Sequence, residues 1–136
     1  MVPVSIVSMQ LSALASMTAG GGVLNGAKVH LYQNNYIPGK SSALADFTEC
    51  TYAGYAAQSA GTWGAPYVGV DGLPHVTCPS LQFQSTDSVT PNVAYGVYVT
   101  NAGSTVLLFS GLFDQPVPMI DATTGLVYEP DYIFGY

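Results

Sequence analysis

Four residues of this chain are of the types that bind zinc: His30, Cys50, His75 and Cys78. His75 and Cys78 are three positions apart, and on a strand this spacing directs two side chains to opposite faces. The sequence has no Cys-x-x-Cys pair of the kind that forms structural zinc sites. We therefore expect no metal site, and the alternation of polar and apolar residues around His30 predicts that this histidine faces solvent.

The carboxylates of Asp46 and Glu49 are three residues apart and can act as a general acid and base if they share one helical face. Nothing beside them would separate their pKa values, and Asp46 suits a turn or a helix cap equally well. The stretch TAGGGVLNG, residues 18–26, looks like a nucleotide loop but follows a predicted helix and lacks the lysine. We expect no catalytic residue, no cofactor and no enzymatic activity.

Cys50 and Cys78 leave two alternatives open. Both can be buried free thiols, which pack as small hydrophobic groups. They can also form one disulfide if the fold brings their Cα atoms to about 5.5 Å, a distance that the sequence does not fix.

Trp63 and Tyr67 are candidates for contact with a glycan. Aromatic rings beside Asp and Asn residues can stack on the apolar face of a sugar while the polar groups bind its hydroxyls. The alternative is that Trp63 fills the core or a subunit boundary.

The composition excludes several partners. Only 7% of the 136 residues are charged, whereas 49% are hydrophobic and ten are tyrosines. Because Lys28 and Lys40 are the only basic residues, we expect no nucleic-acid binding, and the net charge of -6 disfavours an anionic membrane surface. The sequence has no apolar run of bilayer-spanning length and no basic segment near its start, so we expect a soluble, uncleaved chain. A surface so poor in charge suits a subunit of an assembly.

The elements that would position these residues are one helix and a series of strands. Apolar residues at steps of three and four predict a helix within residues 3–19, ended by Gly20, Gly21 and Gly22, and residues 1–22 form a helical arm that can reach a neighbour. Residues 27–32 alternate in polarity and predict a half-buried strand. A helical turn capped by Ser42 is expected next.

Residues 23–136 are expected to form a single β domain. Seven further strands are predicted at residues 51–58, 65–70, 75–78, 81–85, 93–100, 104–113 and 125–130. Their short spacing, with 15 Gly and 9 Pro, indicates a mainly β fold, an antiparallel sandwich or barrel with one N-terminal helix.

Residues 93–113 predict a hairpin whose turn places Gly103 at positive φ. Simple alternation puts Leu107, Phe109 and Phe113 on one face of the second strand, and the other face is apolar too. Both faces must then be covered. The candidate subunit interface comprises that other face and the aromatic tail, which we expect to dock on a neighbour: Val106, Leu108, Leu112, Tyr132, Phe134 and Tyr136.

Two long stretches carry a recognisable pattern: AKVHLYQNNYIPGKSSALADFTECTYAGYAAQ, residues 27–58, and YGVYVTNAGSTVLLFSGLFDQPV, residues 95–117. Together they resemble a family of small virion-associated structural proteins of tailed bacteriophages. The chain departs from the family pattern at Cys50 and at residues 109–113, where relatives often carry an acidic-basic pair. The matching residues are Lys28, Leu31, Asn34, Asn35, Pro38, Leu44, Ala45, Asp46, Phe47, Thr48, Glu49, Gly54, Tyr55, Gly96, Tyr98, Val99 and Thr100.

The resemblance implies an accessory or decoration protein of a virion, assembled in the host cytoplasm, that stabilises the capsid or tail. Its partners would be copies of itself and a major capsid or tail protein. The alternative is a virion adhesin or carbohydrate-binding module that uses Trp63 and its neighbouring tyrosines.

Overall fold

The computed structural model describes residues 6–19, 22–86, 92–120 and 125–133, and strands predominate in it. The predicted mainly β fold with one N-terminal helix is confirmed. The elements are α1 (Ile6–Thr18), β1 (Lys28–Tyr32), a 3-10 helix (Leu44–Asp46), β2 (Gln58–Ser59), β3 (Tyr67–Val68), β4 (Pro74–Thr77), β5 (Leu81–Gln84), β6 (Asn92–Thr100), β7 (Leu107–Met119), β8 (Gly125–Tyr128) and β9 (Asp131–Ile133).

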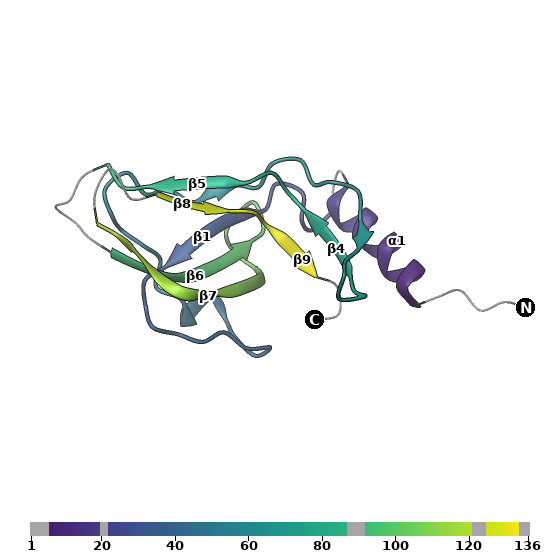
Figure 1. Ribbon diagram of the computed structural model, residues 1–136, viewed down its shortest axis with the longest axis horizontal. Helices are drawn as coiled ribbons and strands as arrows, with labels where there is room; N and C mark the ends of the chain where they lie inside the picture. The colour runs from purple at the N-terminus through teal and green to yellow at the C-terminus, as the bar shows by residue number, and fades with distance from the viewer. Residues whose placement is uncertain (1–5, 20–21, 87–91, 121–124, 134–136) are drawn as a thin grey trace, which may run out of the picture.

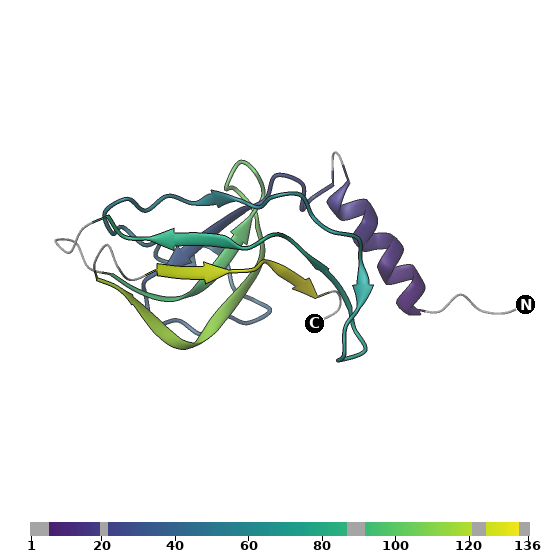
Figure 2. The same cartoon turned by 45° about the horizontal axis from the view of Figure 1, so that its top comes forward.

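The strands form three antiparallel sheets with the orders β2-β1-β6-β7, β3-β4-β9 and β5-β8. The β5-β8 pair lies across one face of the four-stranded sheet, as Figures 1 and 2 show. The main core lies between these two layers, where Val29, Leu31, Val97 and Val99 meet Phe83 of β5. In the described residues the arrangement is therefore layered, which is the sandwich form of the two predicted alternatives.

Helix α1 lies at one end of the molecule, beside β4 (Figure 1). Leu14 is fully buried in the main core, so this apolar helix packs against its own chain. After the helix, the Leu24 N–H donates to the Met17 carbonyl at 2.9 Å. A Cβ at Gly22 would overlap that same carbonyl, which is why the chain needs glycine at this position.

The prediction that β1 is half-buried was wrong. Val29 and Leu31 face the main core, but His30 and Tyr32 on the opposite face are buried as well. The chain after β1 folds back over that face, where its Phe47 ring packs on Tyr32 of β1 and Tyr98 of β6 to form a second cluster. A loop that returns over the sheet leaves no periodic signal in the strand itself.

The face assignment of the predicted hairpin was also partly wrong, because the pairing of β6 with β7 shifts register. Thr100 is opposite Leu107 but Val99 is opposite Phe109, so Leu108 is an extra residue on β7. Leu107 consequently packs on the second cluster, whereas Leu108 and Phe109 pack on the main core.

Turn chemistry explains two smaller differences. The residue with positive φ in the β6–β7 turn is Ser104 at 56°, not Gly103, and the Asn101 side chain holds the turn by accepting the N–H groups of Thr105 and Val106. The 3-10 helix follows Ala43 rather than Ser42, and Asp46 accepts the Ala43 N–H at 2.8 Å.

Residues 51–58 contain less strand than predicted. Gly54 has a φ of 83° and the Tyr55 N–H donates to the Tyr52 carbonyl, so the chain turns here and only β2 remains. Conversely, β9 was not predicted as a strand. It pairs with β4 of the same chain, Tyr132 opposite Val76, so the described part of the tail docks on its own body.

Candidate functional site

A groove of about 760 Å³ lies on the surface of the described residues, and we call it the β7–β9 groove. One wall is the first half of β7, the second is β9 and the third is the loop between β1 and the 3-10 helix. Its lining residues are Ile37, Pro38, Gly39, Lys40, Ser42, Leu107, Leu108, Phe109, Ser110, Gly111, Leu112, Asp131, Tyr132 and Ile133.

Two sheet edges border this groove. β7 is the last strand of the four-stranded sheet and β9 the last strand of the three-stranded one. Among the described residues, no strand pairs with the outer edge of either. Residues 107–113 of β7 contain no charged residue and no proline, although charges and prolines are what commonly protect an exposed edge. The groove therefore offers unpaired backbone beside apolar side chains.

Two of the predicted interface residues are exposed at this edge. Val106 is 52% exposed and Leu112 is 47% exposed. Nearby on the loop wall, Ile37 is 74% exposed. Single exposed apolar residues are common on proteins, but here Leu112 and Ile37 line one groove beside the unpaired edge of β7, and Val106 directly precedes that strand.

The other predicted interface residues are placed differently. Leu108 and Tyr132 are partly buried against the main core while also lining the groove. The ring of Tyr132 lies 5.2 Å from that of Phe109, which joins β9 to β7 at the groove floor. Phe134 and Tyr136 lie outside the described residues.

His30 is buried and lies at the centre of a hydrogen-bond network, which corrects the prediction that it faces solvent. Its Nδ1 lies 2.8 Å from the Glu49 carboxylate and its Nε2 lies 2.9 Å from the Thr100 hydroxyl. The Tyr55 hydroxyl donates to the same Glu49 oxygen at 2.8 Å, and the Tyr98 ring stacks on the imidazole. Burial raises the pKa of Tyr55, and the contact with Glu49 adds to the rise. This network fastens β1 to β6.

The two carboxylates of the imagined acid-base pair have separate structural contacts. Glu49 binds His30 and Tyr55, whereas Asp46 accepts the Ala43 N–H and the Tyr36 hydroxyl.

His75 lies between two carboxylates that the sequence analysis did not connect with it. Its Nε2 is 2.9 Å from the Asp71 carboxylate and its Nδ1 is 3.0 Å from that of Asp131. The exposed ring of Tyr67 stacks on the imidazole, with centroids 5.5 Å apart. A turn brings Asp71 to His75, but only the pairing of β9 with β4 brings Asp131, which is 56 residues away in sequence.

The His75 cluster predicts a pH dependence of stability. Burial alone lowers the pKa of His75, but the hydrogen bonds and charges of Asp71 and Asp131 raise it more, so its pKa lies above the usual value. His75 therefore stabilises the folded state fully at pH values below its unfolded pKa of about 6.5. This stabilisation is lost as the pH rises through the folded pKa. The hydrogen bond from Leu73, and then that from His75, hold the pKa of Asp71 below its usual range. The Asp71 contribution is therefore present above the unfolded pKa of about 3.9 and is lost as pH falls through the folded pKa.

We expect the melting temperature to fall by about 2–4 °C between about pH 6 and about pH 8.5, a modest effect because both carboxylates are partly solvated. The replacement His75→Gln should flatten this profile. Scanning calorimetry across the pH series would measure it, and an unchanged slope in His75→Gln would assign the pH dependence to other groups.

The buried free-thiol alternative is the one that the structure shows for Cys50 and Cys78. The Cys78 thiol donates to the Gly61 carbonyl at 3.0 Å. Burial raises the pKa of Cys50 to about 12, and the charge of Glu49 adds to the rise. Within the described ranges, no three residues of the His, Cys, Asp and Glu types are grouped in a way that could hold a metal ion.

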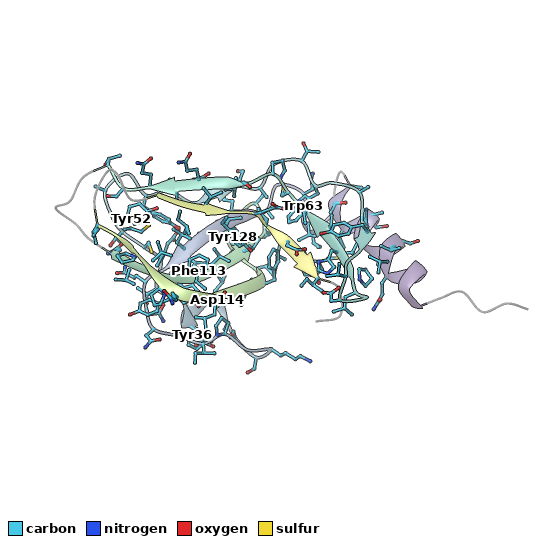
Figure 3. All side chains as sticks on the ribbon, in the orientation of Figure 1. Tyr36, Tyr52, Trp63, Phe113, Asp114 and Tyr128 are labelled. Carbon is cyan, nitrogen blue, oxygen red and sulfur yellow. The ribbon has the colours of Figure 1, made fainter. Side chains whose placement is uncertain are left out.

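Trp63 belongs to the core, which corrects its assignment as a glycan contact. It is 8% exposed, and its indole N–H donates to the Leu24 carbonyl at 2.7 Å. Figure 3 places it at the end of the molecule near α1. Tyr67 is exposed as predicted, but it stacks on His75 without an accessible tryptophan face beside it.

Comparisons of the chain with models of protein families, with curated proteins and with solved structures gave no match. In the part of the chain that the structure describes, no helix has the length and apolar character needed to cross a bilayer.

Proposed function

We propose that this chain is a structural protein of a bacteriophage virion, an accessory or decoration protein that stabilises the capsid or tail through subunit contacts. The single observation that carries the proposal is the open, uncharged edge of β7 beside the β7–β9 groove. An edge of this kind promotes aggregation of a free monomer. In a protein that contacts other subunits, the same edge can form the contact.

The exposed apolar side chains support the same reading. They are large and are spread over several elements. The chain has only two basic and eight acidic residues, so few charged side chains surround them. Those described as exposed are Val23, Ile37, Tyr67, Val68, Val70, Val93, Val106, Leu112, Ile120 and Val127.

The residues that resemble phage virion proteins make architectural contacts. The Asn34 side chain donates to the Asp46 carbonyl and accepts the Thr48 N–H. Glu49 joins the His30 network, and Gly54 occupies a turn with positive φ. These contacts hold loops and turns in place, and they support a non-enzymatic role.

The chain's partners would be copies of itself and a major capsid or tail protein. Nucleic acid is an unsuitable partner, since two lysines cannot neutralise many phosphates. The adhesin alternative is weakened because Trp63, its proposed stacking platform, is covered.

Mass spectrometry of purified virions from an infected culture tests the proposal. We expect this chain among the virion proteins at a fixed copy number that tracks the major capsid or tail protein through a density gradient. A soluble non-virion protein of the same infected cells serves as the contamination control. Absence of the chain from intact particles, with its presence in the lysate, would contradict a virion role.

A further inference from the structure

We infer that the first half of β7 pairs edge to edge with β7 of a second copy of this chain. The two strands run antiparallel around a twofold axis near Gly111, and the four strands of each sheet form one continuous eight-stranded sheet. The inference rests on the proposed function as an assembling protein, and it identifies a second copy of the chain as the molecule that binds beside the β7–β9 groove.

The two halves of β7 differ in their fitness for pairing. Its first half, residues 107–113, is uncharged and has no proline, so no backbone N–H is missing from its outer edge. Its second half carries Asp114, Pro116 and Pro118, which oppose the addition of a strand. The opposite edge of the same sheet is β2, which has two residues. The first half of β7 is therefore the edge at which this sheet can be extended.

The register follows from the regular part of β7. Between the two register shifts, residues 109–112 pair one for one with β6. Phe109 and Phe113 pack toward the main core, while Leu112 points to the other, exposed side. A twofold axis at Gly111 sets Phe109 of one copy opposite Phe113 of the other and Ser110 opposite Leu112. This register pairs aromatic with aromatic on the inner face and shields Leu112 on the outer one.

The same register complements charge. It brings Asp114 of one copy toward the groove of the other, which Lys40 lines. Asp114 and Lys40 are each exposed, and Lys40 is one of only two basic residues in the chain. Figure 3 shows Asp114 next to Phe113 along β7, so this carboxylate lies at the end of the pairing segment. An isologous contact would place opposite charges near each other twice, once in each copy.

The first experiment measures the oligomeric state of the purified chain by light scattering over a concentration series up to about 100 µM. We expect a dimer, and we expect Leu112→Lys to raise the dimer Kd by about tenfold or more because it brings an ammonium group into an apolar contact. The matched control is Val70→Lys, which introduces the same charge at an exposed valine of the β3–β4 turn outside the groove. The control should leave the Kd unchanged. Circular dichroism of both variants checks that they fold.

The second experiment fixes the register. A Cβ at Gly111 would meet nothing closer than Val97 Cγ2 at 3.8 Å, so Gly111→Cys is tolerated in space. At the twofold axis of an antiparallel pair the two new Cα atoms lie about 4.5–5.5 Å apart, within the range of a disulfide. Oxidation should give a covalent dimer of Gly111→Cys and none of Val127→Cys, an exposed position on β8.

A wild-type monomer at the highest concentration, or a dimer that Leu112→Lys leaves intact, would overturn the edge pairing. A dimer without the Gly111→Cys cross-link would overturn the stated register. These outcomes are independent of the virion measurement, because a chain found in particles can contact other proteins through another surface. Equally, a dimer confirmed in solution would stand even if the chain proved absent from particles.

Discussion

Replacing Gly96 by alanine should lower the free energy of unfolding by about 3 kcal/mol, a large effect for the addition of one methyl group. A Cβ at Gly96 would overlap the Gly111 carbonyl oxygen and lie 2.7 Å from the Tyr32 hydroxyl oxygen. The side chain of Tyr32 cannot easily move aside, since it is fully buried and its hydroxyl donates to the Tyr36 carbonyl at 3.0 Å. The added methyl group must therefore push β6 away from β7 or displace a buried ring.

Urea unfolding followed by circular dichroism would measure this change. Gly39→Ala is the matched control, because a Cβ at Gly39 meets no atom within 4 Å. The control should change stability by less than about 0.5 kcal/mol. Equal stabilities for the two variants would mean that Gly96 is not needed for the close approach of the strands.

The replacement Trp63→Ala should destabilise the chain by about 3–5 kcal/mol, because it removes a large buried ring and leaves a cavity. Loss of the indole N–H also leaves the Leu24 carbonyl without this 2.7 Å hydrogen bond. Trp63→Phe keeps most of the buried ring and should cost less, about 1–3 kcal/mol. A melting temperature lower by about 10 °C or more is expected for the alanine variant.

Tyr67→Ala is the control for Trp63→Ala, since Tyr67 is aromatic but 45% exposed. It should lower the melting temperature far less, by the loss of its stacking on His75 alone. A Trp63→Ala protein as stable as the wild type would contradict the core assignment. It would also reopen the interpretation of Trp63 as a surface residue whose ring contacts a sugar.

The candidate site was only partly readable from the sequence. Val106 and Leu112 could be identified because they are apolar residues in an uncharged hairpin strand. Leu108 was placed with them by simple alternation, but the extra residue on β7 turns it toward the main core. The third wall, with Ile37 and Lys40, comes from a loop about 70 residues earlier in the chain.

The two histidines illustrate the same limit. His30 stands in an alternating segment and reads as exposed, yet its partner Thr100 is 70 residues away and becomes adjacent only when β1 pairs with β6. His75 likewise obtains Asp131 from a strand at the other end of the chain. The partners of both histidines are therefore set by which distant strands pair, and the local sequence pattern does not reveal this.

The sequence by itself determined the class of structure, mainly strands with one N-terminal helix, and a composition with only two basic residues. These follow from local properties, because periodicity, turn chemistry and charge act between residues close in the chain. Only the tertiary structure decided that Trp63 is buried and that an unpaired strand edge borders a groove. It also decided that two register shifts between β6 and β7 change which side chains face the core. Those features depend on the long-range register of strands, where a shift of one residue exchanges the buried and exposed faces.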